Sequence, residues 1–303
     1  MGRSSSDRIE KGDAPSARPP RPGISWVWVP LLPFFLFAIA FLLVPSISIV
    51  YRSFQGPQGQ FTFGNFVELF QRSDLIRAYR NSLSISFITA IAGGVFGFLL
   101  VYAVILGGLP RGLRVFLMTF SGVASNFAGV PLAFAFISTL GRVGLLTSLL
   151  SSVLGFDLYR SGFSIYNIWG LSLVYMYFQF PLMVLVMAPA LDGLRREWRE
   201  ASQILGATGP AYWRYVALPV LLPSILGAMI LLFGNSFGAY ATAYAFTGSN
   251  LSLVTIAISA QIRGDVLYNP GLGNALAFGM VIVMGVTMLG YSYMQRKASR
   301  WLR

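Results

Sequence analysis

The stretch that decides the fold is Glu200-Ala201-Ser202-Gln203-Ile204-Leu205-Gly206, followed after nine residues by Val216-Ala217-Leu218-Pro219. It is polar and charged, and it lies between two long apolar stretches of the chain. Gly206, Gly209 and Pro210 are residues that interrupt helices. We therefore expect residues 191–212 to form a helix, a turn and a second helix. Leu218-Pro219 would open the next helix, with proline at an early position where its missing N–H matters little.

Outside this segment the chain is strongly apolar, with 55% hydrophobic and only 11% charged residues. This composition is too apolar for a soluble domain of 303 residues. Six windows contain no Asp, Glu, Lys or Arg, and each can hold the roughly 20 apolar residues that a membrane-spanning helix needs. We expect an all-α membrane protein with six transmembrane helices, and the fifth window leaves spare length for a loop. The windows are residues 22–51, 81–110, 115–141, 161–191, 215–262 and 266–295.

Residues 1–25 differ from the rest, because serines, prolines and mixed charges predominate there. Such a segment cannot bury a core, and we expect a disordered cytoplasmic tail. The apolar run that begins at Trp26 is longer than the apolar region of a cleavable signal, so we expect a retained first span. The membrane domain would then cover residues 26–303.

The basic residues indicate the orientation. With the N-terminus inside, fifteen of the 22 Lys and Arg residues fall on the cytoplasmic side and seven outside. The positive-inside rule then favours both termini in the cytoplasm. The same topology places residues 192–217 in the cytoplasm. It also explains the net charge of +12 without nucleic acid, because the basic residues are spread over loops and tails.

The segment quoted above resembles the EAA loop of the permease subunits of binding-protein-dependent ABC importers. That family pattern reads E-A-A, three residues, Gly, nine residues, Ile, any residue, Leu-Pro. Ser202 replaces the second Ala and Val216 replaces Ile, and both replacements conserve size. The resemblance covers residues 75–300. It implies the MetI-like fold of type I importer permeases in a bacterial cytoplasmic (inner) membrane.

The resemblance also implies partners and a coupling site. Two ABC ATPase subunits would bind the loop, a second identical or homologous permease would lie beside this chain, and an extracytoplasmic solute-binding protein would dock outside. The chain would have no catalytic residue, metal or cofactor of its own, because ATP is bound by the partner subunit. For Glu200 alone, a solvated carboxylate paired with Arg196 is the simpler interpretation. The implied ATPase contacts are Glu200, Ala201, Ser202 and Gly206, with Arg196 and Arg199 bordering them.

Other energy sources and activities find little support in the sequence. Lys11 and Lys297 are followed by Gly12 and Ala298, so no Walker A motif exists. All ten carboxylates lie in tails or loops, which disfavours a carrier driven by protons or sodium. The chain has neither His nor Cys, so an intramembrane enzyme is disfavoured as well. A self-sufficient secondary carrier or channel for a small solute remains the alternative to an importer subunit.

The translocation path must be assembled from polar, uncharged side chains. For each candidate taken alone, a hydrogen bond between helices or an aromatic ring at the membrane interface is the simpler interpretation. Two glycine pairs at small-xxx-small spacing, Gly93 with Gly97 and Gly234 with Gly238, are expected to bring helices together. The path candidates are Asn126, Tyr175, Gln179, Asn235 and Tyr240.

The solute is expected to be small and polar. Residues 235–248 resemble the polyamine and iron branch of these permeases, and their aromatic side chains could pass an organic cation. We therefore expect a polyamine-like cation. Phe61-Thr62-Phe63-Gly64-Asn65-Phe66 is similar to the F-T-x-x-N-F entry after the first helix of this family, and it would either touch a docking protein or pack on the bundle. Residues 145–154 are expected to form a short interfacial helix.

Overall fold

The computed structural model describes residues 31–157, 159–160, 162–263 and 268–299. The expected tail, residues 1–25, lies outside these residues. The chain divides into two units, residues 1–48 and 49–303, which are described separately. The described part of the first unit contains α1 (Leu32–Ala38), a π-helical turn (Ile39–Leu43) and the beginning of α2 (Val44–Ser53).

Six helical segments of the described residues are long and apolar enough to cross a membrane, as the sequence predicts. The second of them, α4, begins at Ser73, directly after Arg72, whose backbone is extended. It therefore starts before the second charge-free window and includes charged residues at its first turns. Its 34 residues exceed the roughly 20 needed to span a bilayer, so the charged end can lie beyond the hydrocarbon. The segments are Leu32–Ser53, Ser73–Leu106, Val130–Leu154, Ile168–Asp192, Gly209–Phe237 and Pro270–Arg296.

The third expected span is not one helix. Residues 127–129 divide it into α5 (Arg111–Asn126) and α6 (Val130–Leu140). The division has a local cause, because Gly129 adopts a positive φ of 77° and Pro131 follows at the start of α6. The candidate span in this region covers Val130–Leu154 and includes α7 (Leu145–Leu154). The short helix expected over residues 145–154 is therefore confirmed, and its position at the membrane interface stays a prediction.

The fifth window also departs from the expected span and loop. After α11 (Leu218–Phe237) the chain breaks at residues 238–240, and it then forms α12 (Ala241–Thr247) and α13 (Val254–Arg263). Both short helices bury apolar side chains, including Ala243 and Val254, which have no exposed surface. The residues expected to form a loop are therefore part of the packed helical unit.

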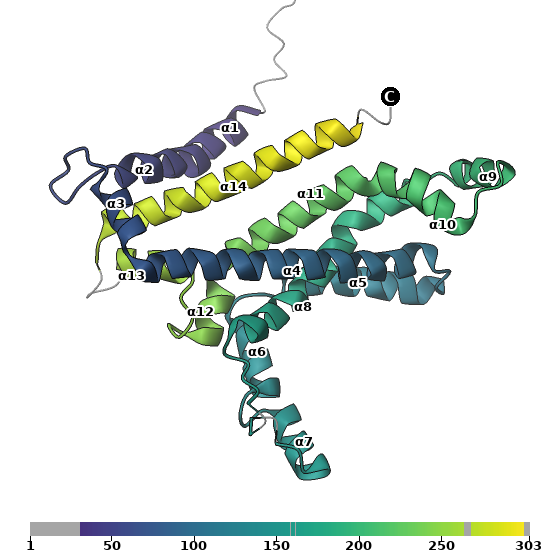
Figure 1. Cartoon of the computed structure of the whole chain (residues 1–303), viewed down its shortest axis with the longest axis horizontal. Helices are drawn as coiled ribbons and strands as arrows, with labels where there is room; N and C mark the ends of the chain where they lie inside the picture. Colours follow the sequence, from purple (N-terminus) through teal and green to yellow (C-terminus); the bar gives the residue numbers. More distant parts are fainter. Residues whose placement is uncertain (1–30, 158, 161, 264–267, 300–303) are drawn as a thin grey trace, which may run out of the picture. The chain divides into compact units, whose positions relative to one another are not determined.

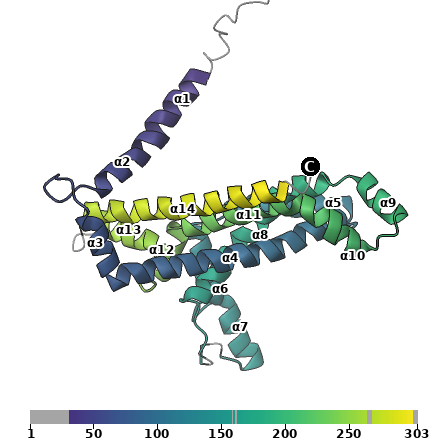
Figure 2. The same ribbon diagram turned by 45° about the horizontal axis from the view of Figure 1, so that its top comes forward.

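The second unit is built around α4 and α8 (Ile168–Asp192), which pack along each other (Figure 1). α5 packs on α8, and α14 (Pro270–Ser299) packs on α11 and α13. Two clusters of buried apolar side chains hold these helices, one around Met183 and Leu232 and the other around Tyr175 and Leu132. In Figures 1 and 2, α3 (Gly64–Gln71), α13 and the start of α14 lie at one end of this unit, and α9 (Arg196–Ile204) and α10 (Gly209–Tyr212) lie at the other.

Both π-helical turns of the described residues directly precede a residue followed by proline. Val44 donates its N–H to the Ile39 carbonyl and is followed by Pro45. Leu218 donates to the Trp213 carbonyl and is followed by Pro219. A proline ring clashes with the carbonyl four residues earlier, and a wider turn relieves this contact. The expectation that Leu218-Pro219 opens a new helix is therefore wrong. The helical segment already begins at Gly209 and continues through the π turn to Phe237.

Candidate functional site

The helix–turn–helix predicted for residues 191–212 is present. α9 ends at Ile204, and Gly206 follows with a φ of 80°, in the left-handed region that favours glycine. Gly206 donates its N–H to the Gln203 carbonyl (2.9 Å), and Ala207 donates to the Ser202 carbonyl (2.9 Å). These two bonds form a Schellman motif, which satisfies carbonyls that a helix end leaves free. Gly206 thus fixes where α9 ends, six residues after Glu200.

Most side chains of the predicted coupling set are exposed. Glu200, Ala201, Arg196 and Arg199 lie on the surface, whereas Ser202 is buried and donates its hydroxyl to the Arg199 carbonyl (2.7 Å). Among the ion pairs between described residues, none joins Glu200 to Arg196. The carboxylate of Glu200 is therefore not held by the arginine one turn before it.

The apolar tip of this segment was missed by sequence reasoning. Ile204 is 86% exposed and Leu205 is 87% exposed, at the end of a helix whose other side chains are mostly charged or polar. Arg195, the residue before α9, has its guanidinium 5.9 Å from the ring centroid of Trp198 on that helix. Two aliphatic residues directly before the helix-ending glycine were the available signal. An exposed apolar tip on a charged helix is typical of a docking surface.

The flanks of the segment are attached to the bundle. Arg114, near the start of α5, forms an ion pair with Asp192 at the end of α8 (2.9 Å). On the other flank, Trp213 packs edge-on against Tyr102 of α4 with ring centroids 5.1 Å apart, and Ala217 is fully buried. Helical structure continues from α10 through the π turn into α11. α10 and α11 therefore belong to one nearly continuous helical segment, Gly209–Phe237, and residues 205–208 connect α9 to it.

A pocket of about 550 Å³ lies where two helical segments are broken. One wall is the α5–α6 break, with Ser125 and Gly129, and the other is the α11–α12 break, with Gly238 and Tyr240. Gly129 donates its N–H to the Thr242 hydroxyl (2.7 Å), which joins the two breaks. Non-helical backbone at membrane depth is tolerated where it is buried or lines a water-filled cavity. The pocket is therefore the best candidate for a section of the translocation path.

The five predicted path residues occupy different environments. Asn235 and Tyr240 line the pocket, and the Tyr240 hydroxyl lies 3.0 Å from that of Ser259. Asn126 is exposed at the end of α5, beside Ser125, and its amide donates to the Gly122 carbonyl (3.0 Å). The structure therefore brings Asn235 and Tyr240 together, with Asn126 next to the same helix break.

Tyr175 and Gln179 lie in the interior instead. The Tyr175 hydroxyl donates to the Ala239 carbonyl (2.9 Å), and the Gln179 amide donates to the Leu232 carbonyl (2.8 Å). Gln179 has no exposed surface, and its Oε1 has no hydrogen-bond partner. Tyr175 thus joins α8 to the α11–α12 break, and Gln179 joins α8 to α11, which matches the alternative of a bond between helices.

The pocket lining contains no charged side chain. Its polar groups are hydroxyls, one amide and backbone groups at the helix breaks, and Tyr240 stacks on Tyr244 with centroids 5.5 Å apart. Such a lining can hydrogen-bond to a polar solute of either charge and offers an aromatic face to a cation. The lining residues are Ser125, Ala128, Gly129, Phe178, Gly234, Asn235, Gly238, Ala239, Tyr240, Ala241 and Thr242.

Comparison with protein families gives a match over residues 151–303 to the binding-protein-dependent transport system inner membrane component. The sulfate transport system permease protein CysT of Salmonella typhimurium is 28% identical over 231 residues, which are 75% of this chain and 76% of the relative. The spermidine/putrescine transport system permease protein PotC of Haemophilus influenzae is 25% identical, over 82% of this chain and 90% of the relative.

Solved structures share the fold. A chain of a bacterial ABC transporter for the acidic polysaccharide alginate superposes with a TM-score of 0.70 at 20% identity, covering 89% of this chain and 95% of that chain. A chain of the MetNI methionine ABC transporter, in an inward-facing conformation, gives 0.54 at 18% identity, covering 74% and 95%.

Proposed function

Since this chain belongs to the family of binding-protein-dependent transport system inner membrane components, the multi-pass permease subunits of ABC importers, we propose that it carries a small polar solute inward and receives its driving force through α9. The observation that supports this assignment best is the exposed tip at Ile204 and Leu205, next to the glycine that ends α9. ATP hydrolysis would occur on a separate partner chain.

In this proposal both the charged side chains of α9 and the apolar tip at Ile204 and Leu205 contact the ATPase. Glu200, Arg196 and Arg199 are free to form ion pairs with the partner, and Ile204 and Leu205 would be buried on docking. Burying a leucine or isoleucine side chain contributes about 1.5–3 kcal/mol. The Schellman turn at Gly206 would hold both sides in one orientation. Closure of two ATPase subunits would then move α10 and α11, and with them the α11–α12 break.

The remaining partners follow from the relatives. The alginate transporter has also been solved in complex with an alginate-bound periplasmic protein. We propose a solute-binding protein outside, two ATPases inside and a second permease, identical or homologous, beside this chain. Both termini would lie in the cytoplasm, which places α9 on the ATPase side.

For the solute, the neutral pocket sets no requirement on charge. A polyamine-like cation is supported by the stacked Tyr240–Tyr244 pair and by the similarity to PotC. A small oxyanion is supported by the similarity to CysT and by the lack of any carboxylate lining the pocket. We retain the polyamine-like cation as the first solute to test and sulfate as the second.

The test is ATP-driven uptake into membrane vesicles that contain the chain with its native partners. Labelled spermidine and labelled sulfate are offered separately, with ATP inside or absent. Uptake of either solute that requires ATP supports the importer assignment, and the solute taken up identifies the substrate class. Uptake by the purified chain alone, without ATP, would favour the self-sufficient carrier instead.

A further inference from the structure

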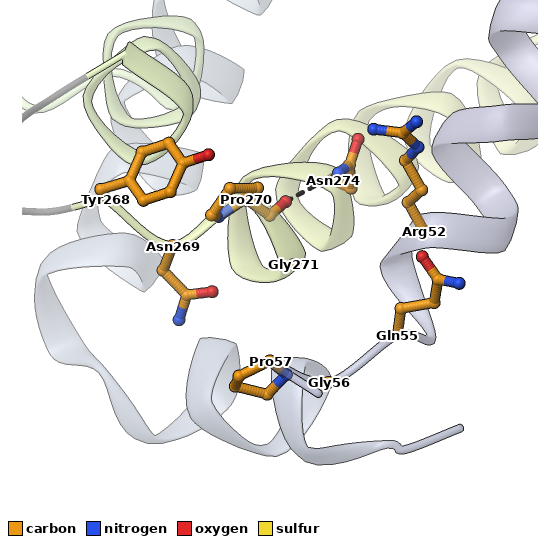
Figure 3. Close-up of a pocket in the computed structure, with 9 residues that line it drawn as sticks. All are labelled: Arg52, Gln55, Gly56, Pro57, Tyr268, Asn269, Pro270, Gly271 and Asn274. Atoms are coloured by element: carbon orange, nitrogen blue, oxygen red, sulfur yellow. Dashed lines mark hydrogen bonds between the residues drawn. The ribbon is translucent and has the colours of Figure 1, made fainter. Parts of the chain in front are cut away.

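A second pocket, of about 540 Å³, lies beside the start of α14, at the end of the second unit opposite α9 (Figure 1), and its lining is drawn in Figure 3. It is formed by the end of α2, the loop after it and the start of α14, all within residues 49–303. The figure shows Arg52, Gln55 and Asn274 on one side of the opening, and Asn269 and Tyr268 on the other. The lining residues are Arg52, Gln55, Gly56, Pro57, Tyr268, Asn269, Pro270, Gly271 and Asn274.

The charge in the lining of this pocket is positive only. Arg52 is the one charged residue in the lining, and it forms no ion pair with a carboxylate among the described residues. Glu68, the carboxylate that reaches the lining by contacting the Asn269 amide (3.4 Å), is paired with Arg72. The pocket also lies at the N-terminal end of the 30-residue α14, where the helix dipole is positive. The site therefore attracts an anion and disfavours a metal cation.

Several hydrogen-bond donors are available beside Arg52. Asn274 uses one amide proton for the Pro270 carbonyl (2.7 Å) and keeps the second. The Gln55 side chain forms no hydrogen bond with another described residue, and the Tyr268 hydroxyl is exposed. A guanidinium can bind two oxygens of one oxyanion at once, and neutral amides can add further bonds without adding charge.

The pocket is held in shape by a buried asparagine. Asn65 has only 6% of its surface exposed, and its amide donates to the carbonyls of Ser53 and Gln55, both at 2.9 Å. Gly271, in the first turn of α14, packs closely on the loop after Arg52. A Cβ atom at Gly271 would stand 2.9 Å from the Gln55 carbonyl oxygen. The loop after Arg52 is thus fixed against the start of α14 before any ligand binds, which lowers the entropic cost of binding.

We propose that this pocket binds a small oxyanion, with Arg52 as the charged contact and Gln55 and Asn274 as amide donors. Sulfate, phosphate and the phosphate of a lipid headgroup share the required chemistry: negative oxygens that accept several N–H bonds. The site is separate from the neutral pocket at the helix breaks, and it does not depend on the proposed transport function.

The first test is binding of sodium sulfate and sodium phosphate to the full chain in an uncharged detergent, measured by titration calorimetry at low ionic strength. We expect Arg52→Gln to weaken binding at least tenfold, because one charge-assisted pair is lost. Arg52→Lys should bind with intermediate affinity, since it keeps the charge but not the planar fork. Arg77→Gln is the matched control, because Arg77 is exposed on α4 and outside the pocket.

The second test addresses a lipid source of the same chemistry. The chain and its Arg52→Gln variant are placed in phosphatidylcholine nanodiscs with or without phosphatidylglycerol, and the bound lipid is counted by native mass spectrometry. Loss of bound phosphatidylglycerol in Arg52→Gln alone would support the site and identify a headgroup as its ligand. Anion and lipid binding that are equal in the wild type, Arg52→Gln and Arg77→Gln would overturn the proposal. Neither test involves an ATPase, so its failure would leave the transport assignment intact.

Discussion

Gly97 of α4 lies directly against Met183 of α8: a Cβ atom on Gly97 would stand 2.6 Å from the Met183 Cβ. Gly93, one turn earlier, has the same relationship to Gln179, at 2.9 Å. The two glycines therefore let α4 and α8 approach closely, as their spacing predicts. Gly234 faces Met284 of α14 instead, where a Cβ would stand 2.7 Å from the end of a flexible side chain.

Gly97→Ala should destabilise the protein, because the new methyl group cannot be accommodated without moving α4 from α8. Overpacking of this kind costs about 1–3 kcal/mol. Gly122→Ala is the control, since Gly122 lies in α5 and a Cβ there would meet nothing within 4 Å. It should gain about 0.5–1 kcal/mol from helix propensity. Thermal unfolding in detergent checks both, and an equal midpoint for the two variants would contradict the close packing.

Gly206→Val should abolish ATP-driven uptake while the chain still inserts into the membrane. The positive φ at Gly206 is costly for any residue with a Cβ, by roughly 1–2 kcal/mol for the left-handed region, so the turn after α9 would rearrange. Gly209→Ala should keep uptake, because Gly209 starts α10, has no positive φ and has open space around it. Uptake rates, normalised to the amount of chain in the membrane, distinguish the two. Normal uptake by Gly206→Val would remove the role proposed for the turn.

Leu205→Ser should weaken binding of the ATPase partner without changing the fold. A buried leucine contributes about 1.5–3 kcal/mol, so the dissociation constant should rise by at least roughly tenfold. Val143→Ser is matched to it, since Val143 is also an exposed aliphatic residue (94%) but lies between α6 and α7. Sedimentation of labelled ATPase with purified chain measures the affinity. A similar loss in both variants would point to a general effect of surface polarity.

Asn235→Leu should lower solute uptake, because an apolar group takes the place of an amide in the pocket lining. Binding of the ATPase partner should be unchanged. Gln179→Leu should leave uptake near the wild-type rate. Its side chain is fully buried and does not line the pocket. The Leu232 carbonyl that loses the Gln179 bond lies inside α11 and keeps its helical hydrogen bond, and the unpartnered Oε1 is removed. Initial uptake rates of the two variants decide between a path role and a packing role. Equal losses would argue against the pocket as part of the path.

The number of spans and the helix–turn–helix at α9 could be predicted from the sequence, because both depend on local composition. A charge-free window marks a span, and Gly206 at the right distance from Glu200 marks the end of a short helix. The sequence of the Phe61–Phe66 segment allows two interpretations. In the structure Asn65 is buried and Phe66 contacts Phe278 of α14, so this part of the segment packs on the bundle. Phe61 and Phe63 are 72% and 60% exposed, and contact with a docking protein stays a prediction.

The helix breaks at residues 127–129 and 238–240 could not be predicted from the sequence. Residues 127–129 and 238–240 carry no charge, so neither break interrupts its charge-free window. Whether a glycine breaks a helix or packs against a neighbour depends on tertiary contacts, and Gly97 and Gly129 illustrate the two outcomes. The separation of Asn235 from Gln179 likewise depends on which face of each helix turns inward. That face is not encoded in the periodicity of spans that are apolar on all sides.

The central claim is that α9 joins this permease to an ATPase, and the most direct test is recovery of the complex from gently solubilised native membranes. Mass spectrometry would identify what is purified with the tagged wild-type chain, Gly206→Val, Leu205→Ser and the control Gly209→Ala. We predict a P-loop ATPase with the wild type and Gly209→Ala, and its depletion with the other two variants. Recovery of the wild-type chain without any P-loop ATPase, or equal recovery with all four chains, would contradict the account.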